Sequence, residues 1–325
     1  MQARILRIGF TLTLLILLVG SAAAQEGLKK LRVSYPSGSI CCLPLFGAIE
    51  WKLFAENGLQ AEIIQVRSQI ANTATYSGEV QYVAGVGPAS VSATLRGMPS
   101  RAVWFATDQL IYSLVARPEF QNVRDLRNKK IGITGLGGTQ HVALQVALES
   151  MGENPKNFAY LALGAPQLLS ALETGTIDAA MFSPPQDFFA KKKRFREVLD
   201  VGARVKMPLG GMTVLVSTMR NRADEVKRVL RVLQAAKQEI LKSKEKTIAL
   251  MQKFLGVDRE IGEDTYAVYG KTVSGNGVPT HEGMDLIVKS LQSAGQFTDR
   301  KVAFDEIADD RIAKEVAREL GYKVP

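Results

Sequence analysis

The residues from 129 to 148 combine a glycine-rich turn with the start of a helix, an arrangement that can bind a negatively charged group. The pattern predicts a strand over 131–134, glycines at 135, 137 and 138, and a helix over 140–151. We expect Thr139 to be the N-cap, since its hydroxyl can accept a free amide of the first turn. A helix N-terminus carries a partial positive charge and free N–H groups. The stretch therefore predicts a site for a carboxylate, sulfonate, phosphate or other strongly polar group, although an ordinary strand-to-helix connection explains it about equally well.

A dinucleotide site is a second interpretation of the same glycines. Residues 135–138 match half of the G-x-G-x-x-G fingerprint of dinucleotide-binding proteins. That fingerprint also requires an acidic residue after the next strand. Here the next predicted strand, 158–161, is followed by Ala162, Leu163 and Gly164. We therefore reject a nucleotide ligand.

Side chains typical of catalysis and metal binding are few in this chain. Cys41 and Cys42 are the only cysteines, and a disulfide between neighbours would close a strained ring. No further cysteine pair or histidine has metal-ligand spacing, so we expect two thiols, free or ring-closed, beside a binding loop. The two histidines, His141 and His281, are far apart, and no G-x-S-x-G motif occurs. We predict no catalytic residue, no cofactor and no metal.

The N-terminal residues 1–24 have the pattern of a secretory signal peptide. Arg4 and Arg7 precede an apolar run over 10–19, and three alanines over 22–24 provide a cleavage site. The apolar run is shorter than the roughly 20 residues of a transmembrane helix. No cysteine stands at the cleavage point, as a lipoprotein would require. We expect a soluble mature protein exported to a bacterial periplasm.

The chain is basic, with 41 lysines and arginines against 32 aspartates and glutamates in 325 residues. The basic residues are spread over several predicted helices, for example 191–194 and 242–246, and do not form one tract. Nucleic-acid binding would require clustered basic residues with aromatic side chains for stacking. Solvated helix faces explain the excess better, and we expect no nucleic-acid partner.

Strands and helices alternate from residue 31 to about residue 203, which predicts an α/β protein with mostly parallel sheets. Two segments resemble each other: 77–81 leads into a strand that ends at Gly87-Pro88, and 174–178 into one that ends at Ser183-Pro184. The repetition predicts two lobes. Long charged helices follow residue 218, and we expect them to pack on the first lobe.

We predict the following division of the chain. Lobe 1 is discontinuous and consists of residues 25–110 and 213–325, whereas lobe 2 consists of 111–212. The chain then crosses between the lobes near 107–112 and near 210–214. These two segments are the expected hinge.

Four segments, in their order and spacing, resemble periplasmic substrate-binding proteins of ABC importers, in the sulfonate/nitrate/taurine and thiamine-precursor group. Residues 44–59 resemble the first helix of that family and its EEGLDVE exit. Residues 77–80 resemble its SGEVD, 124–131 its SLKDLKGKKI, and 171–180 its ALxxGxIDAA. Gln81 and Asn128 depart from the usual Asp and Gly. The resemblance covers roughly 31–203, and the C-terminal helices agree in pattern only.

The resemblance implies a two-lobed periplasmic-binding-protein type II fold that closes by a hinge around a ligand and delivers it to an ABC permease. It implies a monomeric binding protein and no enzyme. Two alternatives stay open. One is an enzyme like the thiamine-pyrimidine synthases, which use a run of several cysteines and a reactive Lys/His pair, whereas this chain has only Cys41 and Cys42, in a different loop. The other is a ligand sensor that docks on a receptor.

Ligands of open α/β sheets bind beyond the carboxyl ends of the strands, which locates the expected ligand contacts. Ordinary turn chemistry explains any single one of these residues about equally well. Their small hydroxyls and few charges indicate a modest organic ligand, which could be an anion. The predicted ligand-binding residues are Ser37, Ser39, Ile40, Cys41, Arg67, Gly87, Ser90, Gly137, Gly138, Thr139, Gln140, Ser183 and Asp187.

Overall fold

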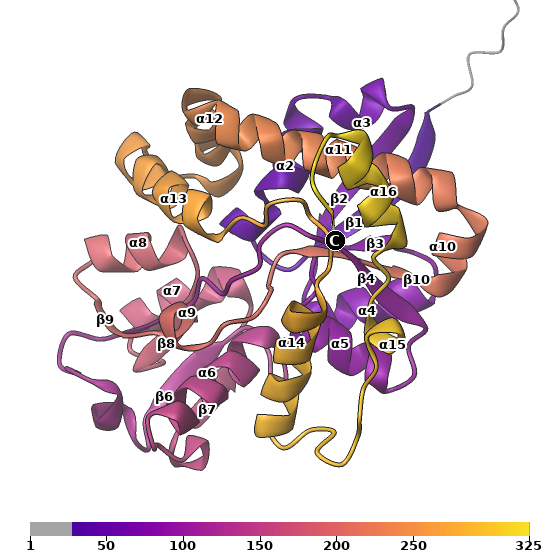
Figure 1. Ribbon diagram of the computed structural model, residues 1–325. Coiled ribbons are helices and arrows are strands. Elements are labelled where there is room, and N and C mark those ends of the chain that lie inside the picture. The colour runs from indigo at the N-terminus through magenta and orange to yellow at the C-terminus, as the bar shows by residue number, and fades with distance from the viewer. Residues whose placement is uncertain (1–27, 325) are drawn as a thin grey trace, which may run out of the picture.

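The computed structural model describes residues 28–324. It contains two five-stranded sheets, each flanked by helices (Figure 1). The predicted signal peptide, 1–24, lies outside the described residues. The first sheet has the order β2-β1-β3-β10-β4 and the second β7-β6-β8-β5-β9. In each sheet one strand runs antiparallel to its two neighbours, namely β10 in the first and β5 in the second. The predicted α/β architecture with mostly parallel pairing around β1 and β6 is confirmed.

The strands of the two sheets come from different parts of the chain. The first sheet contains β1 (Lys29–Tyr35), β2 (Leu59–Gln65), β3 (Tyr82–Val83), β4 (Ser100–Phe105) and β10 (Gly211–Leu215). The second sheet contains β5 (Ser113–Ala116), β6 (Lys130–Ile133), β7 (Ala159–Ala162), β8 (Ala179–Phe182) and β9 (Arg196–Asp200). The chain therefore passes between the sheets over 106–112 and again over 201–210. We keep the lobe boundaries predicted above as our own assignment.

Helices that follow the strands cover the first sheet on both faces. They comprise η2 (Ile40–Cys42), α2 (Leu43–Glu50), α3 (Leu53–Glu56), α4 (Ser68–Tyr76), α5 (Pro88–Leu95), α10 (Val216–Asn221), α11 (Ala223–Lys242), α12 (Lys244–Leu255), α13 (Arg259–Thr272), α14 (His281–Ser293), α15 (Phe304–Ile307) and α16 (Arg311–Glu319). Helix α11 packs against α2 and α16, and α14 packs against α5, so the C-terminal helices cover the first lobe as expected. Helix α14 also contacts α6 of the second lobe.

The second sheet carries a smaller set of helices. They are η3 (Val123–Leu126), α6 (Thr139–Ser150), η4 (Pro155–Asn157), α7 (Ala165–Glu173), α8 (Gln186–Lys192) and α9 (Val201–Arg204). Leu144 and Leu148 of α6 are fully buried with Ile131 and Ile133 of β6. On the other face of the sheet, Leu168 and Leu172 of α7 pack with Phe182.

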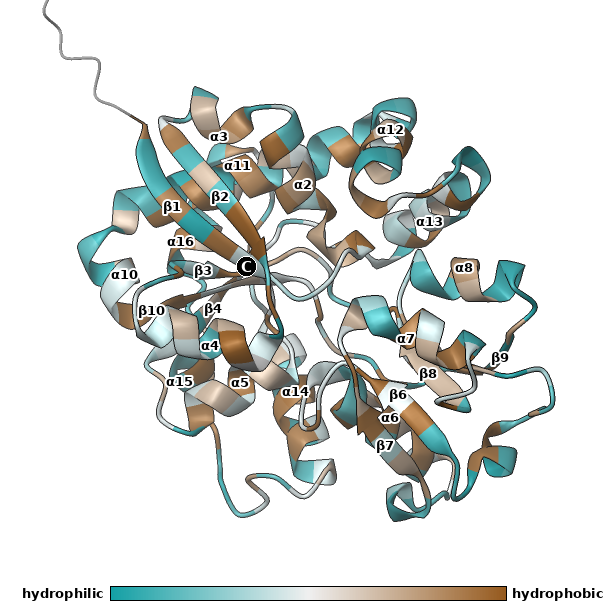
Figure 2. Cartoon of the chain, turned by 180° about the vertical axis from the view of Figure 1, so that it is seen from behind, coloured by the Kyte–Doolittle hydropathy of each residue, from teal (hydrophilic) through white to brown (hydrophobic). Residues whose placement is uncertain are grey.

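Hydropathy follows this layering (Figure 2). Along the neighbouring strands β1 and β2, hydrophilic and hydrophobic residues alternate, while the peripheral helices α8, α10 and α12 carry hydrophilic residues on their outer sides. Among the described residues, no helix combines the length and the apolar character needed to cross a bilayer.

The spacing of apolar and turn residues predicts one helix over 44–54, strands over 198–203 and 212–218, and a turn at Gly262, and these four elements differ from the structure. The helix expected from Pro44 is broken into α2 and α3, because Lys52 adopts a left-handed backbone with φ of 58°. The strand expected over 198–203 ends at Asp200, whose carboxylate accepts the amide of Ala203 and begins α9. Similarly, the strand expected over 212–218 ends at Leu215 and continues as α10. The turn expected at Gly262 lies inside α13, which Asp258 caps.

Candidate functional site

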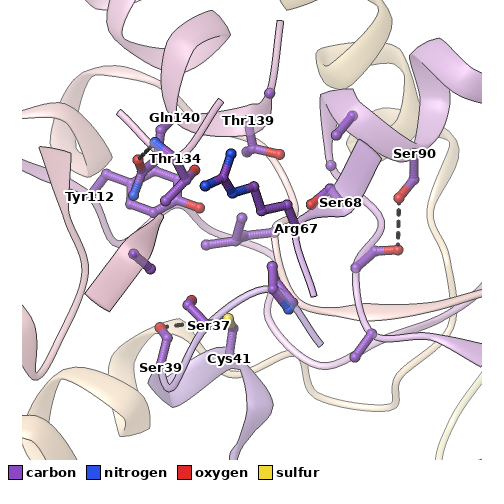
Figure 3. A pocket seen from close by; sticks show the side chains of 18 residues that line it. Ser37, Ser39, Cys41, Arg67, Ser68, Ser90, Tyr112, Thr134, Thr139 and Gln140 are labelled. Atoms are coloured by element: carbon purple, nitrogen blue, oxygen red, sulfur yellow. Dashed lines mark hydrogen bonds between the residues drawn. The ribbon is translucent and has the colours of Figure 1, made fainter. Parts of the chain in front are cut away.

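A cavity of about 60 Å³ lies between the two lobes, at the carboxyl ends of β1, β2, β3 and β6 (Figure 3). This is the place where an open α/β sheet binds its ligand. The first lobe contributes Pro36, Ser37, Ser39, Cys41, Arg67, Ser68, Ala84, Gly85, Gly87, Ala89 and Ser90 to its wall. The second lobe and the crossovers contribute Tyr112, Thr134, Gly138, Thr139, Gln140, Ala165 and Leu209.

Helix N-termini from both lobes meet at this cavity. Its wall includes the first residues of α4, α5, α6 and α7, whose N-caps are Arg67, Gly87, Gly138 and Gly164. All four N-caps have extended backbone, and no side chain of the described chain caps any of these helices. Helices α13 and α14, by contrast, begin with capping side chains, Asp258 and Thr280. The cavity therefore combines the partial positive charges of several helix ends with amides that a ligand can use.

Arg67 adds a full positive charge to the same wall. It is the only charged residue among those that line the cavity in the described chain, and none of the ion pairs within residues 28–324 involves it. Figure 3 shows its side chain extending from the first lobe toward Thr134 and Thr139 of the second. An anion bound here would meet the guanidinium and hydroxyl groups of both lobes.

The predicted role of Thr139 as an N-cap is wrong. The N-cap position of α6 is occupied by Gly138, whose backbone is extended, with φ of −77° and ψ of 173°. Thr139 is the first helical residue. Its side chain instead contacts the opposite lobe. A Cβ atom added to Gly87 would lie 2.9 Å from Thr139 Oγ1, so the two lobes approach each other at this pair.

Most of the predicted binding residues do line the cavity, and these are Ser37, Ser39, Cys41, Arg67, Gly87, Ser90, Gly138, Thr139 and Gln140. The side-chain amide of Gln140 is already engaged. Its Oε1 accepts the amide of Thr134 at 2.9 Å, and its Nε2 donates to the carbonyl of Met181 at 3.2 Å. This residue joins the ends of β6 and β8.

Four predicted residues lie outside the cavity wall, at Ile40, Gly137, Ser183 and Asp187. Ile40 is fully buried in the core, and Gly137 donates its amide to His141 Nδ1 at 3.0 Å. Ser183 Oγ donates to Ser39 Oγ at 3.0 Å. Asp187, in the first turn of α8, is buried with Lys191 Nζ at 3.3 Å from its carboxylate, and burial raises the pKa of its carboxyl group.

The residues predicted from the sequence omit half of the wall. Ser68, Gly85 and Thr134 lie just beyond the ends of β2, β3 and β6, so the strand-end rule identifies them. Tyr112 and Leu209 enter from the crossovers, for which no sequence signal exists. Burial raises the pKa of the Tyr112 hydroxyl, which keeps it a neutral hydrogen-bond donor.

Direct contacts close the lobes around the cavity. The amide of Ile40 donates to the carbonyl of Pro184 at 3.3 Å, and Gln186 Nε2 donates to the carbonyl of Gly38 at 2.5 Å. Further out, Lys192 of α8 pairs with Asp258 at 2.9 Å and with Glu260 at 2.7 Å, both at the start of α13. The two lobes are thus in direct contact beside the cavity.

Metal-binding chemistry finds no support in the described residues. Within 28–324 no three or more His, Cys, Asp or Glu side chains gather as a metal ion would require. Cys41 and Cys42 are free thiols with their sulfur atoms 4.0 Å apart.

Comparison with known proteins identifies both a family and a fold. The model of the family described as NMT1/THI5 like matches residues 41–247. No curated protein matches the chain. A protein of Bordetella bronchiseptica RB50 superimposes with a TM-score of 0.79 at 18% identity, over 91% of this chain and 98% of that one.

Two further similar structures are periplasmic binding proteins with a named ligand. The periplasmic aliphatic sulphonate binding protein SsuA of Escherichia coli gives a TM-score of 0.69 at 15% identity, over 88% of this chain and 99% of that one. The periplasmic nitrate-binding protein NrtA of Synechocystis PCC 6803 gives 0.74 at 12% identity, over 90% and 89%. At such identities the likeness shows the fold, and the predicted two-lobed periplasmic-binding-protein fold is confirmed.

Proposed function

We propose, from the premise that this chain belongs to the NMT1/THI5-like family, that it captures a small organic anion between its lobes and delivers it to an ABC importer. In this proposal the protein is exported to the periplasm, acts as a monomer and docks on a membrane permease. The observation that carries the proposal is the cavity in which Arg67 meets four helix N-termini that lack capping side chains.

Electrostatics supports an anionic ligand over a neutral one. A helix N-terminus stabilises a nearby anion by about 0.3–1 kcal/mol. A guanidinium adds two parallel hydrogen bonds to a carboxylate or sulfonate, which fixes its orientation. No acidic side chain is among the described residues that line the cavity to oppose this charge. SsuA binds an aliphatic sulphonate and NrtA binds nitrate, and both ligands are anions like the one proposed here.

The chemistry of the cavity supports binding of the anion without its hydrolysis. Its described wall contains Arg67, Tyr112 and Cys41 as titratable side chains, and burial keeps the Tyr112 hydroxyl protonated. A hydrolytic reaction would need a general base near the operating pH. His141, which could serve as one, accepts the amide of Gly137 and stacks edge-on against Tyr160. We therefore infer a binding protein and no enzyme.

A thermal-shift panel on the mature chain tests the proposal. It compares methanesulfonate, taurine, nitrate, acetate, benzoate and a pyrimidine with neutral analogues such as dimethyl sulfone. A ligand at 100 times its dissociation constant should add about 2.7 kcal/mol to the free energy of unfolding. Arg67→Ala should abolish that gain, whereas the exposed Arg318 on α16 can be replaced by alanine without effect.

Three results would contradict the proposal. The first is stabilisation by the neutral analogues alone, and the second is an unchanged anion affinity in Arg67→Ala. The third is a chemical product when the bound anion is incubated with purified protein and analysed by mass spectrometry.

A further inference from the structure

The two adjacent cysteines lie on the boundary between the cavity and the core. Cys41 lines the cavity and is partly exposed, whereas Cys42 is only 2% exposed. Their sulfur atoms are 4.0 Å apart, and Cys41 Sγ lies 3.6 Å from Ser39 Oγ. One thiol is therefore accessible from the ligand cleft, and its partner stands directly behind it.

The two thiols differ in acidity as well as in exposure. The hydrogen bond from the Cys42 thiol lowers the pKa of Cys41, and the same contact together with burial raises the pKa of Cys42. The thiolate is the form of cysteine that attacks disulfides. Cys41 is thus the thiol suited to attack a disulfide, and Cys42 is suited to stay protonated during that first step.

We propose that Cys41 and Cys42 form a thiol–disulfide exchange site in the ligand cleft, whose substrate is a low-molecular-weight disulfide. The Cys41 thiolate attacks one sulfur of the disulfide, so that a mixed disulfide forms and one thiolate leaves. Cys42 then gives up its proton and attacks the Cys41 sulfur, which releases the second thiol and leaves a Cys41–Cys42 disulfide. The protein loses two electrons and two protons, the leaving thiolates take up the protons, and the small disulfide is reduced to two thiols.

The product disulfide is strained and hence reversible. Neighbouring Cα atoms in a trans peptide are about 3.8 Å apart, which is less than the 4.4–6.8 Å of ordinary disulfides. Strained disulfides have higher reduction potentials and are reduced again readily. The site therefore cycles between states and does not act as a permanent cross-link.

The position of the pair couples its state to lobe closure. Residues 38–40, immediately before Cys41, provide the contacts to Ser183, Pro184 and Gln186 of the second lobe. Gly210 of the crossover would place a Cβ 2.9 Å from the Cβ of Cys41. A group attached to Cys41 occupies the cavity of about 60 Å³ and opposes closure. This consequence for ligand capture rests on the proposed function, but the exchange chemistry does not.

Stoichiometry with 4,4′-dithiodipyridine tests the exchange on the folded mature protein, without any ligand. The wild type should release two equivalents of thiopyridone and end two hydrogens lighter by mass spectrometry. Cys42→Ser should release one equivalent and retain the pyridylthio group. Cys41→Ser should release its equivalent only after unfolding in guanidinium chloride. A wild type that keeps the adduct, or a Cys41→Ser that reacts as fast as the wild type, would overturn the proposal.

A second measurement tests the coupling to closure. Cys42→Ser is treated with oxidised glutathione, which leaves a glutathionyl group on Cys41, and its radius of gyration is measured by small-angle scattering. We expect an increase over the untreated variant that dithiothreitol reverses. An unchanged radius would show that the modification does not oppose closure. Because neither measurement uses the anion, their failure is distinct from failure of the proposed function.

Discussion

Gly87 and Thr139 face each other across the cleft, and there is room for only a hydrogen atom on Gly87. A Cβ there would lie 2.9 Å from Oγ1 and 3.1 Å from Cγ2 of Thr139. The φ of Gly87 is −73°, which any residue can adopt, so an alanine strains the contact and not its own backbone. We predict that Gly87→Ala keeps its thermal stability but closes incompletely, with a larger radius of gyration by small-angle scattering.

The double variant Gly87→Ala/Thr139→Ala is the matched control for this pair. Removal of the Oγ1 and Cγ2 atoms of Thr139 makes room for the Cβ atom added at residue 87, and we expect this variant to regain the compact form. Loss of the Thr139 hydroxyl should cost little stability, because Gly138 caps α6. A single Gly87→Ala variant as compact as the wild type would show that the lobes do not close through this contact.

Gly138 and Gly137 offer a second comparison between neighbours. Gly138 lines the cavity with φ of −77°, which valine adopts without strain, so Gly138→Val should fold and lose anion binding. Gly137 lies outside the wall with φ of +70°. There, Gly137→Ala should keep anion binding and lose about 1 kcal/mol of stability through left-handed strain. Calorimetric titration and urea unfolding measure the two effects separately, and unchanged binding in Gly138→Val would remove this turn from the site.

Sequence reasoning at the residue scale located segments better than side chains. The strand-end rule led to half of the cavity wall, because it depends only on topology. It could not tell which residue of a loop faces the ligand. Within one loop Ser39 and Cys41 line the cavity while Ile40 between them is buried, and Ser183 reaches the wall only through Ser39.

At the scale of elements, the regular strands and helices of the two sheets were predictable from their periodicity. The errors occur where a single residue or a contact distant in the chain determines where a helix or strand ends. The left-handed Lys52 divides a helix whose apolar pattern continues, and the Asp200 carboxylate turns a strand into α9. Gly262 stays helical inside α13, where it packs against Ile248 of α12. Periodicity contains no information on such contacts.

Helix α11 contains a buried lysine that should make stability depend on pH. Lys237 is fully buried; its Nζ donates to the carbonyl of Ser274 at 2.7 Å and lies 5.3 Å above the ring of Trp104. Burial lowers its pKa to about 7. Between this value and its ordinary pKa of 10.5, the folded protein binds fewer protons than the unfolded chain, so stability falls as the pH falls.

We predict that Lys237→Met removes this dependence. The advantage of the variant over the wild type should grow as the pH falls from 10 toward 7 and level off below, with an upper limit of about 5 kcal/mol from the pKa shift. The lost hydrogen bond to Ser274 is a cost that does not vary with pH. Urea unfolding at each pH measures the difference, and Lys242→Met, at the exposed end of α11, is the control. A pH-independent difference would mean that Lys237 stays charged.

For the whole molecule, the alternation of elements and the internal repeat were sufficient to predict two lobes with a ligand cavity between them. How firmly the lobes hold together was beyond the sequence. Closure depends on pairs distant in the chain, such as Gln186 with Gly38 and Lys192 with Asp258 and Glu260. Such partners are fixed by the relative placement of two separately folded sheets. No sequence pattern around either residue of such a pair indicates which residue it contacts.

The last prediction concerns these ion pairs, because Lys192 belongs to α8 of the second lobe and both carboxylates to the start of α13 on the first. Lys192→Glu replaces two attractions with repulsions and should shift the protein toward an open form with a larger radius of gyration. The neighbouring Lys193 pairs with Glu173 of its own lobe, so Lys193→Glu makes the same charge change without crossing the cleft. The difference between the two variants should shrink at 1 M salt, where exposed charges are screened. Equal radii for both variants at low salt would show that lobe closure does not depend on the ion pairs of Lys192.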